Sequence, residues 1–146
     1  MIVFITGATA GFGAAMARTF VRNGHQVIIS GRRADRLQAL AAELGEAALP
    51  VVLDVTDKAS IKAALDGLPA AWQTIDVLIN NAGLALNVAP AHEASLEDWD
   101  TMIATNISGL VAMTRALLPA MVARNSGRAA WLSSAARPAG GRRGAR

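Results

Sequence analysis

The sequence contains no cysteine, and none of its 146 residues is a tyrosine. The lack of cysteine excludes a disulfide framework and a thiolate metal site, and we expect no metal centre. No uninterrupted apolar run approaches the ~18 residues of a membrane-spanning helix. The first expected strand begins at residue 2, which leaves no room for a signal peptide. The sequence therefore predicts a soluble cytoplasmic protein that does not bind a membrane.

Charge is unevenly distributed along the chain. The formal net charge is +3, but five of the fourteen basic residues lie in residues 128–146, which hold no acidic residue. Residues 1–127 therefore carry nine basic and eleven acidic residues, a net charge of −2. Aromatic residues make up only 4% of the chain, and no folded nucleic-acid-binding motif is present. We therefore expect no nucleic-acid partner, although clustered arginine in itself attracts phosphate.

The remaining composition is that of a folded domain. Hydrophobic residues make up 53% of the chain and charged residues 17%, which argues against disorder. A chain of this length fits one domain and can bury roughly 68–70% of its unfolded surface.

The first thirteen residues combine a strand, a turn and a helix start. Ile2–Ile5 is an apolar, largely β-branched run, and it is followed by Gly7, Gly11, Gly13 and a helical pattern from Ala14 to Val21. Glycine lets backbone N–H groups approach a phosphate without obstruction by a Cβ atom, and a helix N-terminus adds further donors. The stretch thus predicts an anion site, with a dinucleotide pyrophosphate as the favoured occupant. The alternative is a strand-to-helix turn that only packs closely, because short glycine motifs are weakly specific.

A second expected strand, Gln26–Ser30, ends in Gly31, Arg32 and Arg33. In a doubly wound sheet this strand end meets the adenosine ribose, where an acid suits NAD and an arginine accommodates the 2′-phosphate of NADP. Two arginines and no acid favour NADP. Alternatively, Arg32 and Arg33 are only the exposed start of the next helix, expected at residues 33–44.

A third strand is expected at Pro50–Val55. Asp54 and Val55 then lie at its carboxyl end, where ligands bind in such sheets. An equally good interpretation makes Asp54 a turn residue before a helix that is capped by Thr56 or Asp57.

A fourth strand, Ile75–Ile79, runs into Asn80-Asn81-Ala82-Gly83. Small amides followed by alanine and glycine suit a place where the backbone passes close to a ligand while the side-chain amides tie neighbouring strands together. Further along, Ser95 resembles a helix N-cap, and apolar spacing predicts a long helix from about Trp99 to Arg124.

Two polar positions follow. Asn106 interrupts the apolar pattern of the long helix, and a buried amide needs a partner; the alternative is that it faces solvent. A weaker fifth strand, Arg128–Leu132, then leads to Ser133 and Ser134.

Thr-Gly-x-x-x-Gly-x-Gly at residues 6–13 and Asn-Asn-Ala-Gly at residues 80–83 together resemble the short-chain dehydrogenase/reductase family. The resemblance implies an α/β, Rossmann-like, doubly wound parallel sheet, here incomplete with five of the usual seven strands. It also implies hydride transfer between NADP and a carbonyl or alcohol carbon, with Asn106 and Ser134 as catalytic residues. Ser134 would bond the substrate oxygen, and Asn106 would hold a water in the proton relay. The expected cofactor residues are Gly7, Ala8, Thr9, Ala10, Gly11, Phe12, Gly13, Arg32, Arg33, Asp54, Val55, Asn81, Ala82 and Gly83.

The resemblance fails after residue 134. The family places a catalytic Tyr-x-x-x-Lys pair about a dozen residues beyond the serine, where residues 135–146 are rich in Arg, Gly and Ala and contain neither Tyr nor Lys. We therefore expect an NADP-binding domain at residues 1–134 and a disordered tail at 135–146, and our hypothesis is that truncation or a shifted reading frame replaced the rest.

Within the family, the segments around the glycine turn, Arg32 and Arg33, and residues 80–99 most resemble the NADP-dependent 3-hydroxy acid dehydrogenases. The resemblance implies a small 3-hydroxy acid substrate, such as serine or allo-threonine, and homo-oligomers for full-length relatives. Two interpretations remain for this chain: an oxidoreductase by descent, or a non-catalytic NADP-binding module.

Overall fold

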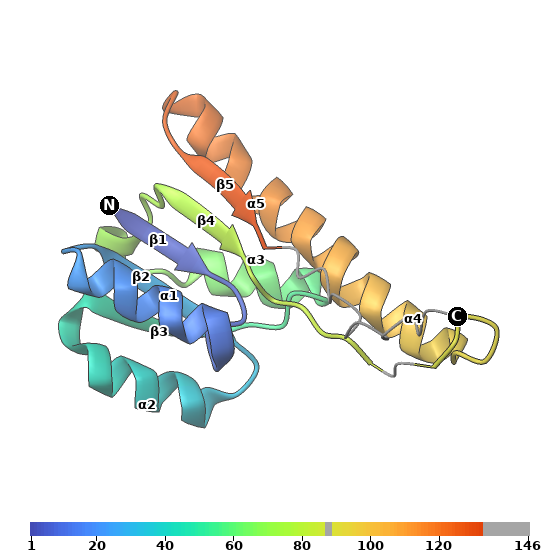
Figure 1. The fold of residues 1–146 in the computed structure, drawn as a ribbon. Coiled ribbons are helices and arrows are strands. Elements are labelled where there is room, and N and C mark those ends of the chain that lie inside the picture. The colour runs from blue at the N-terminus through green and yellow to red at the C-terminus, as the bar shows by residue number, and fades with distance from the viewer. Residues whose placement is uncertain (87–88, 133–146) are drawn as a thin grey trace, which may run out of the picture.

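The computed structural model describes residues 1–86 and 89–132. Its strands are all parallel and form one sheet in the order β3-β2-β1-β4-β5 (Figure 1). The strands are β1 (Ile2–Ile5), β2 (Gln26–Gly31), β3 (Ala48–Val52), β4 (Val77–Asn80) and β5 (Arg128–Trp131). This confirms the predicted Rossmann-like, doubly wound α/β fold with five strands.

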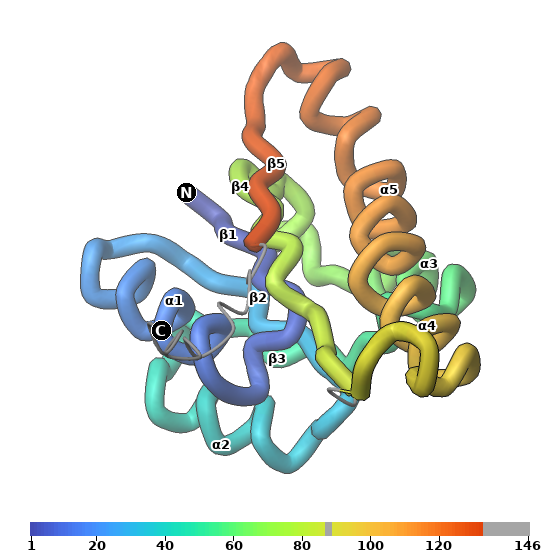
Figure 2. Tube along the Cα trace, turned by 45° about the vertical axis from the view of Figure 1, so that its right-hand side comes forward, coloured from blue at the N-terminus to red at the C-terminus, as the bar shows by residue number. Residues whose placement is uncertain are grey.

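Helices cover both faces of the sheet (Figures 1 and 2). They are α1 (Gly11–Arg22), α2 (Ala34–Leu44), α3 (Lys58–Asp66), α4 (Leu96–Ile103) and α5 (Leu110–Ala123), with short 3-10 turns η1 (Gly45–Ala47) and η2 (Ala70–Trp72) and a π-helical turn η3 (Ala104–Gly109). Successive side chains of a strand point to opposite faces, so each strand contributes to two apolar clusters. Because both faces are buried, the central strands are apolar throughout rather than alternating with polar residues.

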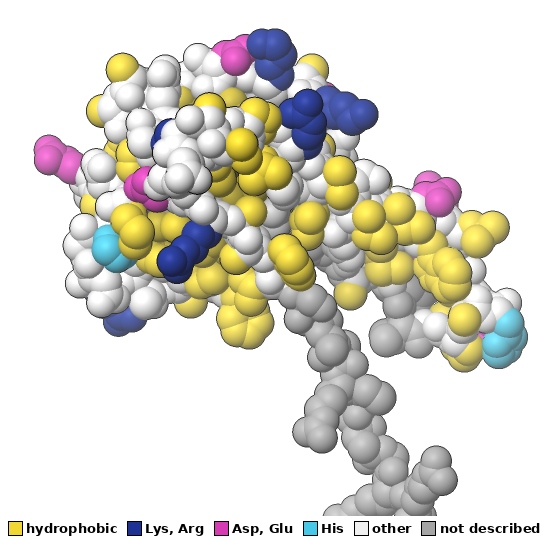
Figure 3. Space-filling view, turned by 90° about the horizontal axis from the view of Figure 1, so that it is seen from above, with side chains coloured by type: hydrophobic (Ala, Val, Ile, Leu, Met, Phe, Trp, Pro, Cys, Tyr) yellow, Lys and Arg dark blue, Asp and Glu magenta, His cyan; other side chains and the backbone are white. Residues whose placement is uncertain are grey.

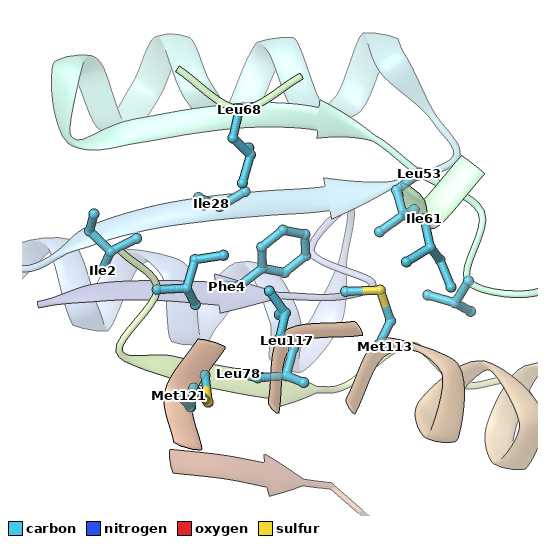
Figure 4. Close-up of a cluster of buried hydrophobic side chains, with 12 residues drawn as sticks. Ile2, Phe4, Ile28, Leu53, Ile61, Leu68, Leu78, Met113, Leu117 and Met121 are labelled. Carbon is cyan, nitrogen blue, oxygen red and sulfur yellow. The ribbon is translucent and has the colours of Figure 1, made fainter. Parts of the chain in front are cut away.

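One cluster joins the sheet to α1 and α2, and the other joins it to α3 and α5. In the first, Val3 and Ile5 pack with Ala17 and Leu37. In the second, shown in Figure 4, the members are Ile2, Phe4, Ile28, Leu53, Val55, Ile61, Leu68, Ile75, Leu78, Met113, Leu117 and Met121. The two clusters hold the carboxyl ends of β1, β2 and β4 side by side, which is what positions the site.

The predicted limits of two strands differ from those observed. The third strand was expected at Pro50–Val55 but spans Ala48–Val52, because its pairing with β2 ends where Gly31 meets Val52. The fourth was expected to begin at Ile75 and begins at Val77, where its register with β1 starts at Val3.

The segments α4, η3 and α5 form one continuous helix of 28 residues, Leu96–Ala123. Ser95 caps it as predicted, with its side chain accepting a hydrogen bond from the Asp98 N–H. Its most apolar 18-residue window has a mean hydropathy of 1.3, so by length and composition alone it could cross a membrane. However, Met113, Leu117 and Met121 of this helix are buried against the sheet, as in a helix of a soluble α/β domain.

Candidate cofactor site

The carboxyl ends of the strands open into a cavity of about 1400 Å³. It lies where the strand order reverses between β1 and β4, which is the position at which open α/β sheets bind ligands. The predicted cofactor residues that line it are Gly7, Thr9, Ala10, Gly11, Phe12, Arg32, Arg33, Asp54, Val55, Asn81, Ala82 and Gly83. The tertiary fold thus brings four separate predicted segments to one cavity.

Two predicted cofactor residues, Ala8 and Gly13, are not among the residues that line the cavity. The side chain of Ala8 is fully buried, and its N–H donates to the Ser30 carbonyl at 2.9 Å. At Gly13, a Cβ atom would lie 2.5 Å from the Gly7 carbonyl oxygen. These two residues therefore shape the turn through their packing.

The glycine turn leaves the first turn of α1 open to an anion. Among the described residues no side chain caps this helix at Ala10, and its first turn holds no acidic residue, so its N-terminal N–H groups keep their hydrogen-bonding capacity. Gly7 adopts a φ of 67°, and a Cβ atom there would lie 2.8 Å from the Ala82 Cα. The turn can therefore lie directly against the Asn-Asn-Ala-Gly segment. A dinucleotide pyrophosphate fits this arrangement of free donors without side chains.

Thr6 and Asn81 fasten the two motif segments together. The buried Thr6 hydroxyl accepts hydrogen bonds from the N–H groups of Asn81, at 3.0 Å, and Ala82, at 2.9 Å. In return, the Asn81 amide nitrogen donates to the carbonyls of Thr6, at 2.9 Å, and Gly7, at 3.0 Å. The predicted tie between neighbouring strands through a side-chain amide is thus present at Asn81. The part of Thr6 was not predicted, although Thr6 stands within the glycine motif.

The two arginines at the end of β2 have different surroundings. Arg33 donates a hydrogen bond to the Thr9 hydroxyl in the glycine turn at 2.7 Å. Both arginines line the cavity, and both are exposed, with Arg33 directly before α2 as its N-cap. The structure is therefore compatible with both interpretations, the ribose-phosphate role and the exposed start of a helix.

Asp54 lies two residues beyond the end of β3 and is held in a turn. Its carboxylate accepts hydrogen bonds from the Thr56 N–H at 2.9 Å and from the Thr56 hydroxyl at 2.8 Å. Partial burial raises the pKa of Asp54, but these bonds and the charge of Arg32 outweigh it and hold the pKa below its ordinary value. Both interpretations of Asp54 therefore hold. It forms the turn before α3, whose N-cap is Asp57, and it also lines the cavity.

Asn106 lies in the π-helical turn and binds the loop that follows β4. Its side-chain oxygen accepts from the Leu84 N–H, and its side-chain nitrogen donates to the Leu84 carbonyl, both at 2.8 Å. The expectation of a specific partner is therefore met, although the residue is exposed rather than buried. A π-turn often marks a functional position in a helix. Ser134, the other predicted catalytic residue, lies outside the described residues.

Further residues that were not predicted as cofactor residues also line the cavity. Beyond the predicted residues it is lined by Ser30, Gly31, Leu53, Asn80, Leu84, Ala85, Met102, Thr105, Leu110, Trp131 and Leu132. Asn80 is buried, and its amide nitrogen donates to the Thr114 hydroxyl of α5 at 3.1 Å. Its position in the Asn-Asn-Ala-Gly segment could have identified Asn80 as a cavity residue. Met102 and Leu110 could not be identified in this way, because they reach the cavity only through the path of the long helix across the strand ends.

The sequence matches the family model of the short chain dehydrogenases over residues 1–145. The chain belongs to the short-chain dehydrogenase family. Its sequence is 62% identical over 127 residues to the NADP-dependent 3-hydroxy acid dehydrogenase YdfG of Salmonella typhi, a match that covers 87% of this chain and 51% of that protein. It is 54% identical over 122 residues to the serine 3-dehydrogenase of Rhizobium radiobacter, covering 84% of this chain and 49% of that protein.

Solved structures of short-chain dehydrogenases superpose closely on this chain. The closed form of serine dehydrogenase complexed with NADP⁺ has a TM-score of 0.91 and 56% identity, and the match covers 92% of this chain and 54% of that one. A metagenomic short-chain oxidoreductase in complex with NADP has a TM-score of 0.85 and 34% identity, over 93% of this chain and 63% of that one. The chain thus spans about half the length of the curated relatives that it matches.

Proposed function

We propose that this chain binds NADP(H) in the cavity at the strand ends, as the cofactor-binding part of a short-chain oxidoreductase. The observation that carries the proposal is the open N-terminus of α1, which lies against the Thr6–Asn81 clamp and shares a cavity with Arg32 and Arg33. The α1 turn would hold the pyrophosphate, the two arginines the 2′-phosphate, and Asp54 and Val55 the adenosine. Two relatives support this assignment. One is named as an NADP-dependent dehydrogenase, and the structure of the other contains NADP⁺.

For the whole protein we propose hydride transfer between NADP(H) and a 3-hydroxy acid, such as serine, or its oxo form. When bound, the nicotinamide would accept a hydride from the alcohol carbon or, in the reverse direction, return it to the carbonyl carbon. Ser134 would hold the substrate oxygen, while Asn106 would position the backbone after β4 through Leu84. The names of the relatives support this class of substrate. We further propose that the binding domain spans residues 1–134 and that residues 135–146 are a disordered tail.

A second candidate function is NADP binding without turnover, and one observation favours it for the chain as given. Dehydrogenation also requires transfer of the hydroxyl proton, which in the resembled family is the task of a tyrosine, and this sequence has no tyrosine. Loss of a general acid or base lowers turnover by roughly 10²–10⁴-fold.

Titration of the folded chain with NADPH, followed by nicotinamide fluorescence, tests the proposal. We expect saturable binding, weaker binding of NADH, and little serine-dependent reduction of NADP⁺ by the chain alone. No association at millimolar NADPH, with circular dichroism showing a folded chain, would contradict the proposed binding site. Turnover at the rate of a full-length relative would instead contradict the non-catalytic alternative.

A related proposal concerns self-association. The long helix exposes an outer stripe formed by Trp99, Ile103, Ile107 and Val111, and large exposed apolar patches commonly mark protein interfaces. We propose that the protein forms homo-oligomers through this stripe.

A further inference from the structure

The segment that follows β4 is tied to the long helix at two points. Asn106 bonds both backbone groups of Leu84, and the Met102 Sδ accepts a hydrogen bond from the Leu86 N–H at 3.4 Å. Met102 and Asn106 are four residues apart, so they lie about one turn from each other on the same side of the helix. Successive turns of the helix therefore hold alternate residues of one segment.

This segment continues directly from the proposed cofactor residues Asn81, Ala82 and Gly83. Leu84 lines the cavity beside them, and Met102 lines it from the side of the helix. A displacement of the backbone at Leu86 therefore moves the adjoining cavity wall. The contact between Met102 and Leu86 thus lies where a change in one side chain alters the shape of the cavity.

The thioether of Met102 carries a reactivity that other apolar side chains lack. Peroxides oxidise methionine to its sulfoxide, which is polar. Of the five methionines, all of which belong to the described part of the chain, Met102 is the one that lines the cavity, and it is only half-buried. Met113 and Met121, in contrast, are buried in the core. Small oxidants in the cavity therefore reach Met102, whereas the packing of the core protects the other two.

A sulfoxide does not fit the contact with Leu86. The sulphur and the Leu86 nitrogen are 3.4 Å apart, and a hydrogen bond from that N–H to an oxygen requires about 2.7 Å or more. Too little room remains between them for a covalent sulphur–oxygen bond as well. An oxygen on this side of the sulphur therefore displaces the segment, and an oxygen on the opposite side places an additional polar atom at a half-buried position. Both products weaken the tie between the helix and the segment.

We propose that Met102 is an oxidation site that controls the segment after β4 and, through it, the binding of NADP(H); the effect on the coenzyme rests on the proposed function. Hydrogen peroxide transfers one oxygen atom to the sulphur. The O–O bond breaks and an S–O bond forms, so that the thioether loses two electrons and the peroxide is reduced to water. Methionine sulfoxide reductases reverse the modification.

The test treats the full chain with limiting hydrogen peroxide, removes the peroxide, and locates the sulfoxides by mass spectrometry of peptides. We expect Met102 to be oxidised at least about tenfold faster than Met113 and Met121, because susceptibility follows exposure. The oxidised chain should show about tenfold faster exchange of the Leu86 amide and about tenfold weaker NADPH binding, the equivalent of one hydrogen bond. Oxidation of Met102 at the rate of the buried methionines would overturn the proposal.

Two variants assign the effect to one sulphur atom. Met102→Leu nearly conserves the side-chain volume and removes the sulphur. In this variant, peroxide should change neither the Leu86 exchange rate nor the NADPH affinity from the values measured before treatment. Met16→Leu, on α1 and outside the residues that line the cavity, is the matched control and should keep the full response. Because the sequence has no cysteine, thiol oxidation does not contribute. A full response in Met102→Leu would show that the proposal is wrong.

Failure of this proposal and failure of the cofactor site give different results. NADPH titration of the untreated chain tests the cofactor site by itself, and Leu86 exchange is measured without coenzyme. Unchanged Leu86 exchange after oxidation of Met102 contradicts the oxidation site, whatever the NADPH affinity. Absence of NADPH binding before treatment contradicts the proposed function. Incubation of the oxidised chain with methionine sulfoxide reductases should restore the original exchange rate and affinity, which excludes irreversible unfolding as the cause.

Discussion

At the residue scale, Arg32 and Arg33 show how neighbouring side chains of one type acquire different tasks. Arg33 is held by Thr9 of the glycine turn, whereas the charge of Arg32 acts on Asp54 across the cavity. A guanidinium fixed by a neutral hydroxyl keeps its remaining donors for a phosphate. Arg32, in contrast, already interacts with a carboxylate of the protein.

We therefore predict that Arg33→Ala raises the Kd for NADPH by about 10- to 100-fold, the usual value of charge-assisted hydrogen bonds to phosphate. The Kd for NADH should change little, because NADH lacks the 2′-phosphate. Fluorescence titration with both coenzymes measures the difference. Arg36→Ala removes the same charge from an exposed position in α2 that does not line the cavity, and serves as the control. An equal loss of affinity for NADH would contradict a phosphate role.

Asp54 links the site to pH. Because its pKa is lower in the folded chain than in the unfolded chain, the ionised carboxylate stabilises the fold at pH values above about 4, the ordinary pKa of aspartate. This contribution is lost as the pH falls through the folded-state pKa. Asp54→Asn should thus lower the free energy of unfolding by about 1 kcal/mol at pH 7, as for a partly exposed charged hydrogen bond.

Urea unfolding of Asp54→Asn and of the unchanged chain between pH 3 and pH 7 checks this prediction, with the two curves converging below about pH 4. Asp100→Asn, at an exposed position of α4, is the matched control and should show a smaller difference. A difference for Asp54→Asn that stays constant down to pH 3 would show that the carboxylate charge is not involved.

At the element scale, the strand ends depend on contacts between segments far apart in the sequence. Thr6 and Asn81 are separated by 75 residues, yet four hydrogen bonds join the β1 turn to the end of β4. These bonds satisfy polar groups at a place where a Cβ atom on Gly7 would lie only 2.8 Å from the Ala82 Cα. The clamp therefore fixes the glycine turn before any ligand binds, and less conformational entropy is lost on binding.

Thr6→Val keeps the side-chain shape and removes the acceptor for the Asn81 and Ala82 N–H groups. We expect a loss of about 2–4 kcal/mol in the free energy of unfolding, since two part-buried donors lose their partner. NADPH affinity should also fall. Denaturant unfolding measures the first effect, and Thr19→Val, which removes an exposed hydroxyl of α1, should cost under about 0.5 kcal/mol. Similar losses for both variants would argue against the clamp.

The π-helical turn is a second device at this scale. It presents Asn106 to both backbone groups of Leu84 and so ties the long helix to the loop after β4. Asn106→Ala should increase the exchange rate of the Leu84 amide by about tenfold, because it removes the side-chain acceptor of that amide. Ser108→Ala, in the same turn, should leave that rate unchanged. Unaltered exchange in Asn106→Ala would show that the loop is held by other contacts.

At the scale of the whole molecule, two well-packed clusters coexist with an unusually apolar surface. The central strands are buried on both faces, while the long helix exposes its outer stripe along much of its length. In Figure 3 hydrophobic side chains gather over the end of the molecule where α4 lies. Burial of these exposed apolar side chains would therefore favour association at the end of the molecule where α4 lies.

We predict that the chain self-associates through the outer stripe. Replacing Ile103, Ile107 and Val111 together by Ser should shift the mass measured by light scattering toward that of a monomer. Changing Val52 and Leu132 to Ser, away from the stripe, should not. If vesicle flotation recovers the unchanged chain with lipid, and the stripe variant without it, the stripe serves as a membrane-binding surface and the prediction of self-association is wrong.

The sequence by itself determined the strand-turn-helix motifs, the NADP-type arginines and the fold class. These are local patterns, because glycine spacing and apolar periodicity concern residues that are close together in the sequence. Two such motifs in the right order then indicate a known fold. Only the tertiary structure decided that Val52 ends the third strand, that Ala8 and Gly13 do not line the cavity, and that Asn106 reaches Leu84. Each of these depends on pairing or contact between segments far apart in the chain, which local preference does not encode.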